Sequence, residues 1–267
     1  MSTDDTTPAP SAKLPCAPTN GGLTDNRDAY RDAHQDAQAR HAALLVRIAQ
    51  AAHDAGRDPS SVHLLAVSKT FGPDDILALA ACGQRDFGEN YLQEALSKMA
   101  DCAARAPWPL RWHFIGPIQS NKTRPIAEHF DWVHSVERER VAARLNEQRP
   151  AELGPLNVCI QVDVSGEATK SGCDPLEAPV LARAISVMPR LRLRGLMAIP
   201  APSNDPAVQR AQFARVKAVY EAIRSEGIDL DTLSMGMSGD LEEAIGQGAT
   251  IVRVGTALFG SRPPRSG

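Results

Sequence analysis

The sequence predicts a single (β/α)8 barrel. Eight short runs rich in β-branched and aromatic residues alternate with amphipathic helical segments, and the 267 residues are close to the roughly 250 that one barrel needs. Strands that alternate with helices are typical of a parallel sheet covered by helices. An open doubly wound sheet is the alternative, because the pattern alone does not show whether the sheet closes.

The predicted strands are bounded by turn residues and follow one another at regular spacing. They are 62–68, 85–89, 111–116, 132–136, 157–164, 191–199, 232–235 and 250–255. Between them apolar residues recur at helical spacing, as in Leu92, Ala95, Leu96 and Met99, and in Val216, Val219, Tyr220 and Ile223.

A further helix is predicted over 28–56, where Leu44, Leu45, Ile48, Ala51 and Ala52 recur at helical spacing before Gly56. Residues 256–267, after the eighth strand, are too few and too rich in proline for a full covering helix. We therefore expect the helix before the first strand to occupy that vacant position.

Residues 1–25 are acidic and rich in proline, threonine and glycine, which predicts a disordered tail before a barrel domain of residues 26–267. The tail lacks the basic and apolar segments of a secretory signal, and no apolar run approaches the ~18 residues of a membrane span. The five cysteines, Cys16, Cys82, Cys102, Cys159 and Cys173, are scattered and form no CxxC pair. This pattern favours reduced thiols in a soluble cytoplasmic protein.

A formal net charge of −3 gives no general reason to bind nucleic acid or an anionic membrane. Any anionic ligand must therefore be bound by local groups. We expect a monomer, although no pattern in the sequence determines the oligomeric state.

Lys69 stands at the carboxyl end of the first predicted strand, where barrel proteins place their active sites. Leu65, Val67 and Lys69 share one face of that strand, so an inward face would direct the lysine up from apolar neighbours. Desolvation there lowers a lysine pKa from about 10.4 toward ~7–8, and the neutral amine is the form that makes a Schiff base. A lysine that extends into solvent is the alternative.

Two loops rich in small residues follow the seventh and eighth strands, the positions at which this fold often binds phosphate. In the first, glycines let backbone N–H groups converge, Ser238 is a candidate N-cap, and a helix N-terminus adds positive potential. The second contains Gly255 and Thr256. If there is no phosphate, Ser234 and Ser238 merely cap a helix.

Arg253 shares a strand face with Ile251, which directs it into the barrel, where a guanidinium needs an acceptor. A ligand or an internal salt bridge would supply one. His63, His113 and His134 show no metal-type spacing and are interpreted as structural or exposed. Asn90 and Tyr91 could line the pocket wall, Asn90 could equally be a cap, and Lys170 could reach a bound anion or be solvated.

Seven stretches resemble, in order, those of the pyridoxal phosphate homeostasis protein family, which is related to the N-terminal barrel of alanine racemase. They are AVSKT, FGENYLQEA, WHFIGPIQSNK, VDVSGEATKSG, RGLMAIP, LSMGMSGDLEEAI and VRVGTALFG, and they extend from about Val62 to Gly260. The resemblance implies a fold type III barrel that binds pyridoxal 5′-phosphate.

The resemblance assigns seven residues to the cofactor: Lys69, Asn90, Ser234, Ser238, Arg253, Gly255 and Thr256. It implies that Lys69 is the Schiff-base lysine, that Arg253 faces the pyridine nitrogen and that Asn90 stands near the cofactor. The other four residues would surround the phosphate.

An arginine beside the ring nitrogen disfavours the pyridinium form, which makes the cofactor a weaker electron sink. In alanine racemase the second acid/base group is a tyrosine of a C-terminal β domain, and this chain ends seven residues after Gly260, so we expect no such domain. The expected function is intracellular cofactor homeostasis, as a carrier or regulator without turnover that serves apo-enzymes. An amino-acid racemase is the alternative, and a barrel enzyme acting on phosphorylated sugars is a third possibility.

Overall fold

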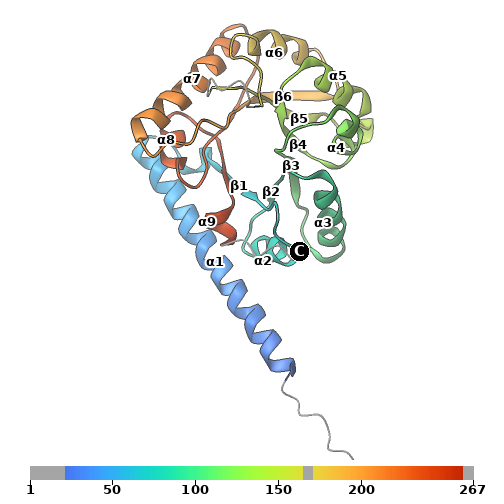
Figure 1. Ribbon diagram of the computed structural model, residues 1–267, viewed down its shortest axis with the longest axis vertical. Helices are drawn as coiled ribbons and strands as arrows, with labels where there is room; N and C mark the ends of the chain where they lie inside the picture. The colour runs from blue at the N-terminus through green and yellow to red at the C-terminus, as the bar shows by residue number, and fades with distance from the viewer. Residues whose placement is uncertain (1–21, 165–170, 261–267) are drawn as a thin grey trace, which may run out of the picture.

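The computed structural model describes residues 22–164 and 171–260, with side chains from residue 35 onward. Eight parallel strands form a closed barrel in chain order (Figure 1). They are β1 His63–Val67, β2 Asp86–Glu89, β3 Arg111–Phe114, β4 Trp132–Val136, β5 Leu156–Gln161, β6 Leu191–Met197, β7 Thr232–Ser234 and β8 Ile251–Val254. The pairing of β8 with β1, in which His63 lies opposite Ile251, closes the barrel. The predicted barrel is confirmed, and the open sheet is excluded.

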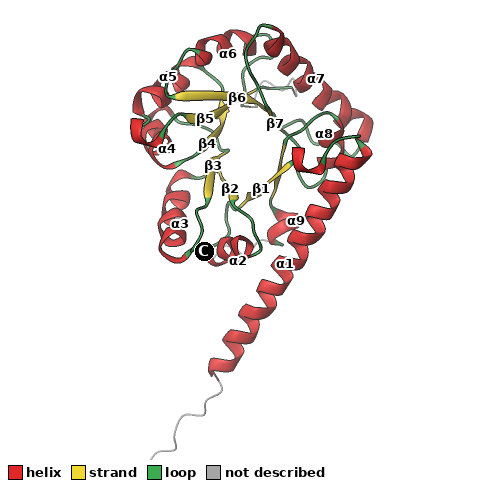
Figure 2. Cartoon of the chain, turned by 180° about the vertical axis from the view of Figure 1, so that it is seen from behind, coloured by secondary structure: helices red, strands yellow, loops and turns green. Residues whose placement is uncertain are grey.

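A ring of helices surrounds the strands, as Figures 1 and 2 show from opposite sides. They are α1 Gly22–Asp54, α2 Pro73–Ala81, α3 Leu92–Arg105, α4 Thr123–His129, α5 Glu139–Gln148, α6 Ala178–Ser186, α7 Pro206–Ser225, α8 Leu241–Gly246 and α9 Thr256–Phe259. Single 3-10 turns occur at Pro59–Ser61, Ser120–Lys122 and Ala151–Leu153. None of the described helices is long and apolar enough to cross a membrane.

Helix α1 occupies the position that a helix after β8 would otherwise take. It packs against α2, α8 and α9, and its N-terminal turns extend beyond the barrel (Figure 1). Leu44 and Ile48 are buried in this contact, and Arg40 Nε donates to the Leu258 carbonyl of α9 at 2.9 Å. The expectation drawn from the short C-terminal segment is confirmed.

Successive residues of a strand point alternately to the core between strands and helices and to the barrel axis. Leu64 and Ala66 of β1 belong to the large apolar core between strands and helices. Leu65 and Val67, on the other face, are buried toward the barrel axis, which extends the same face to Lys69. The inward direction predicted for Lys69 is therefore the one the strand adopts.

Two expectations concern segments at the limits of the described residues. The predicted tail lies outside them except for residues 22–25, which already belong to α1, so this helix begins six positions earlier than the predicted 28. Lys170 lies in the loop 165–170, which is also outside the described residues.

Candidate functional site

A pocket of about 280 Å³ opens at the carboxyl ends of the strands. Six of the seven predicted residues line it: Lys69, Asn90, Ser238, Arg253, Gly255 and Thr256. Val67, Ile115, Ile199, Met237 and Gly239 complete the lining. The pocket therefore combines an apolar wall with a few polar groups, which is typical of a cofactor site. Ser234 lies deeper and does not line it.

Lys69 is half-buried, and both of its neighbours in the chain are held by side chains of β2 and α3. Before it, the Ser68 carbonyl accepts from Lys98 Nζ at 2.9 Å, and the Ser68 hydroxyl donates to Glu89 at 2.6 Å. After it, the Thr70 N–H donates to Glu94 at 2.7 Å. These contacts fix the backbone on each side of Lys69.

The side chains of Glu89, Glu94 and Lys98, which we call the clamp around Lys69, form an ion cluster in which Glu89 and Lys98 are buried. Lys98 Nζ lies 2.9 Å from Glu89 Oε1 and 2.5 Å from Glu94 Oε1. Burial raises the pKa of Glu89, and the hydrogen bond from Ser68 and the charge of Lys98 oppose that shift. Thr70 has φ of 71°, a left-handed conformation that a β-branched residue adopts only where its surroundings over-determine it. The cluster supplies that constraint.

The two loops after β7 and β8 contribute Ser238, Gly239, Gly255 and Thr256 to the pocket lining. Among the described residues, no acceptor takes the N–H groups of Ser238, Gly239, Gly255 or Thr256. Because α8 and α9 are only six and four residues long, their local N–H groups, rather than a long helix dipole, would attract an anion. The loops are held together by the Arg253 N–H, which donates to the Gly236 carbonyl at 2.9 Å.

The prediction that Ser238 caps the following helix is wrong. The N-cap of α8 is Asp240, whose side chain accepts from the Met237 N–H at 2.5 Å. In the turn before α8, Gly236 adopts φ of 96°, and an added Cβ there would lie 2.6 Å from the Ala244 Cβ, so this position requires glycine. The Ser238 hydroxyl makes no hydrogen bond among the described residues and faces the pocket.

Arg253 is buried and points inward, as predicted. Its Nη1 donates to the Ser234 carbonyl at 2.5 Å and to the Ser234 hydroxyl at 3.0 Å, and its Nη2 donates to the Ala198 carbonyl at 2.8 Å. No carboxylate of the described residues lies within ion-pair distance of it, so the predicted alternative of an internal salt bridge is not formed within this part of the chain. Burial lowers the pKa of Arg253 to about 10, against the opposing charge of Asp240, which leaves the group cationic at neutral pH.

Asn90 follows β2, the neighbour of β1, and lines the pocket. Its Oδ1 is buried and has no hydrogen-bond partner among the described residues. A buried acceptor without a partner costs ~1–3 kcal/mol, which a ligand that donates a hydrogen bond would recover. The cap that was the alternative for Asn90 is not formed, because Tyr91 is the N-cap of α3.

A larger cavity of about 660 Å³ lies at the opposite, N-terminal mouth of the barrel. Its arginines are already paired, Arg111 with Asp86 and Arg194 with Asp231, each at 2.7 Å. It therefore offers a ligand no unpaired cation. The described residues contain no cluster of histidine, cysteine, aspartate or glutamate that could hold a metal ion.

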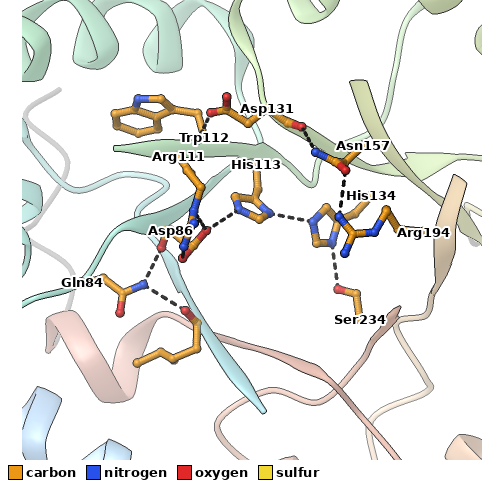
Figure 3. A network of polar contacts seen from close by, with 11 residues as sticks. Gln84, Asp86, Arg111, Trp112, His113, Asp131, His134, Asn157, Arg194 and Ser234 are labelled. Atoms are coloured by element: carbon orange, nitrogen blue, oxygen red, sulfur yellow. Dashed lines mark hydrogen bonds and ion pairs between the residues drawn. The ribbon is translucent and has the colours of Figure 1, made fainter. Parts of the chain in front are cut away.

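His63 is exposed, as the sequence allowed, whereas His113 and His134 are buried and bonded to each other inside the barrel (Figure 3). The sequence pattern indicated only that these two histidines are structural or exposed, and it did not predict a contact between them. Their alternation with buried apolar residues, as in Trp112, His113 and Phe114, was the available signal that they point to the barrel axis.

Comparisons with known proteins agree with this geometry. Residues 36–263 match the family model of the alanine racemase N-terminal domain. The chain is 62% identical over 221 residues to the pyridoxal phosphate homeostasis protein of Pseudomonas aeruginosa, covering 83% of this chain and 94% of that one. It is 50% identical over 231 residues to the protein of the same name from Escherichia coli, covering 86% and 96%.

Solved structures show the same barrel. PipY of Synechococcus elongatus, crystallised with pyridoxal phosphate bound, superimposes with a TM-score of 0.73 and is 36% identical, over 84% of this chain and 100% of that one. Alanine racemase of Corynebacterium glutamicum shares the fold at 19% identity, with a TM-score of 0.61 over 84% of this chain and 62% of that one. The chain therefore belongs to the family of pyridoxal phosphate homeostasis proteins, which is built on the alanine racemase N-terminal barrel.

Proposed function

We propose that this protein binds pyridoxal 5′-phosphate as a Schiff base on Lys69 and takes part in intracellular cofactor homeostasis as a carrier without turnover. The observation that carries the proposal is the convergence of Lys69, the cation of Arg253 and the unpaired N–H groups of two loops in one pocket. The relatives' names and the ligand of PipY support the choice of cofactor.

The residues present fit this cofactor. When bound, pyridoxal phosphate would supply a phosphate group, a pyridine ring and an aldehyde. The aldehyde is the group that condenses reversibly with a neutral amine, with loss of water. The loop N–H groups and the hydroxyls of Ser238 and Thr256 suit the phosphate, and Asn90 Oδ1 is left to accept a hydrogen bond. Arg253 suits the ring nitrogen, where its charge would disfavour protonation of that nitrogen.

The pocket supports binding better than turnover. Racemisation needs a second acid/base group opposite the lysine, and Arg253 is the one other titratable residue among the described residues that line the pocket. An arginine with a pKa of about 10 is a poor base at neutral pH. Tyr220 donates to the Leu230 carbonyl, Tyr91 is half exposed at the N-cap of α3, and neither lines the pocket. An amino-acid racemase therefore remains the second choice.

The proposed partners are apo-enzymes that require the cofactor. The proposed oligomeric state is a monomer. The four described cysteines are free, which favours a reducing compartment, and we propose the cytoplasm.

Two measurements on the cofactor-loaded protein test the proposed function. Incubation with an apo-enzyme that needs pyridoxal phosphate should restore that enzyme's activity, and incubation with L-alanine in deuterated water should leave the α-proton signal unchanged by NMR. Free pyridoxal phosphate at the same concentration is the control for both. Exchange at even ~1 per second, the low end of ordinary turnover, would contradict the proposed absence of turnover. Failure to pass on the cofactor would contradict the carrier.

A further inference from the structure

A continuous chain of hydrogen bonds crosses the barrel interior from its N-terminal mouth to Arg253. Figure 3 shows this chain from Asp86 to Ser234. Asp86 Oδ1 lies 3.0 Å from His113 Nε2, and His113 Nδ1 lies 2.9 Å from His134 Nε2. His134 Nδ1 lies 2.8 Å from the Ser234 hydroxyl, which is 3.0 Å from Arg253 Nη1. Both imidazoles are buried, and one group from each of β2, β3, β4, β7 and β8 contributes.

The Arg253 end favours one direction for every bond in the chain. A guanidinium only donates, so the Ser234 oxygen accepts from it and the hydroxyl hydrogen must go elsewhere. Among the described residues, His134 Nδ1 is the acceptor within reach. His134 then carries its proton on Nε2 and donates to His113 Nδ1, and His113 donates from Nε2 to Asp86.

The Asp86 end requires the same direction. Burial raises the pKa of Asp86, but hydrogen bonds from His113 and Arg111 outweigh it and bring the pKa to about 2, so the carboxylate only accepts. The opposite direction would need a cationic His113 and would leave the Ser234 hydrogen without an acceptor. Burial lowers the pKa of His113 and His134, and the nearby charge of Arg253 lowers that of His134 further, which disfavours the cation. The charges of Asp86 and Asp131 raise the pKa of His113 and so favour its cationic form, but the effect of burial on this pKa is larger.

We propose that Asp86 is a positioning residue for Arg253, which it orients through His113, His134 and Ser234 by holding both imidazoles neutral with the proton on Nε2. The consequence for the cofactor rests on the proposed function, whereas the tautomers do not. We call Asp86, His113, His134 and Ser234 the relay. The family resemblance implies that Ser234 lies at the phosphate, whereas in this proposal it links the two histidines to Arg253.

The tautomers are measured first, on the protein without cofactor, by the 15N NMR signals of the imidazole nitrogens at pH 7.5. The expected result is that His113 and His134 are both neutral and protonated on Nε2. A proton on Nδ1 of either ring, or a cationic His113, would overturn the proposal. This measurement needs no variant and is independent of whether the cofactor binds at Lys69.

Three variants then test whether Asp86 acts at a distance. Asp86→Leu removes the acceptor, so His113 should move its proton to Nδ1, His134 should follow, and the loaded protein should release pyridoxal phosphate about fivefold faster, the loss expected for one hydrogen bond. Asp86→Asn keeps an acceptor and should restore both tautomers. Arg111→Gln removes the bidentate ion pair to Asp86 but leaves the relay, so it should behave like the parent.

The variant series has its own contradicting outcomes. Parent tautomers in Asp86→Leu, or switched tautomers with an unchanged release rate, would show that Asp86 does not position Arg253. Equal changes in Asp86→Leu and Arg111→Gln would show that only the surface ion pair matters. Absence of any cofactor bound to the parent would refute the proposed function while leaving the tautomer result in place.

Discussion

At the scale of single residues, Arg253 is a buried cation whose described partners are neutral oxygens. Burying a charge without a counter-ion costs several kcal/mol, so this arrangement weakens the protein without ligand. The residue is therefore better explained by what it would bind than by what it stabilises.

Replacing Arg253 with glutamine should weaken pyridoxal phosphate binding by about 1.5–3 kcal/mol, because a charge-assisted contact is lost. The melting temperature without cofactor should stay level or rise, because a desolvated charge is removed. Binding titrations and thermal unfolding of the apo-protein measure the two effects. The matched control is Arg194→Gln on β6, which loses its ion pair with Asp231 and should leave cofactor binding unchanged. A drop in apo stability as large as the loss in binding would indicate a structural arginine instead.

Single residues also show where sequence reasoning stops. Lys69, Arg253, Gly255 and Thr256 were found because strand ends and strand faces follow from position in the chain. The N-cap prediction for Ser238 was wrong because α8 begins later than the sequence pattern suggests, with Asp240 at its N-cap. Ser234 was expected at the pocket, but it is the last residue of β7, is fully buried and does not line the pocket.

At the scale of elements, helix α3 does more than cover the barrel. Glu94 and Lys98 occupy successive turns of its inner face and hold the residues on both sides of Lys69. The helix that follows β2 thus fixes the lysine that follows β1. These contacts between neighbouring βα units fix the backbone on both sides of Lys69, and Thr70 adopts a left-handed conformation there.

Glu94→Leu should release the Thr70 N–H, relax the left-handed backbone and lower occupancy by pyridoxal phosphate about fivefold, the effect of losing one hydrogen bond. Occupancy is measured by titration against absorbance. The control is Glu128→Leu on α4, which likewise breaks an i,i+4 pair, with Arg124, and should leave occupancy unchanged. If both variants bind alike, the clamp does not position Lys69.

Element types were predictable, but their partnerships were not. All eight strands follow from runs of β-forming residues, and even the three-residue β7 was located. The contact between His113 and His134 depends on the register of β3 against β4, where His113 lies opposite Trp132. Local patterns contain no information on that register, so the relay was out of reach.

At the scale of the whole molecule, the barrel carries the polar chain from Asp86 to Arg253 through its interior, and its large apolar cluster lies in the layer between strands and helices. The neutral imidazoles at the centre make stability depend on pH. Burial lowers the pKa of His113 and His134 from the ordinary 6.5, and the unfolded chain regains the ordinary value. Below that pH the unfolded state binds more protons than the folded state.

The free energy of unfolding should therefore fall as the pH drops below about 6.5, by up to about 1.4 kcal/mol per pH unit for each histidine, until the folded pKa is reached. Urea unfolding of the apo-protein at pH 7.5 and 5.5 measures this change. His63→Asn removes an exposed histidine and should keep the full dependence, whereas His134→Asn should reduce it. A parent whose stability is the same at both pH values would contradict buried neutral imidazoles.

The most direct test of the account is to locate the cofactor on the chain. The loaded protein is reduced with borohydride, digested, and its peptides are analysed by mass spectrometry, with Lys69→Ala treated in parallel. The account predicts one stable adduct, on the peptide that contains Lys69, and none in Lys69→Ala. A full-occupancy adduct on another lysine of Lys69→Ala would contradict the assignment of the site.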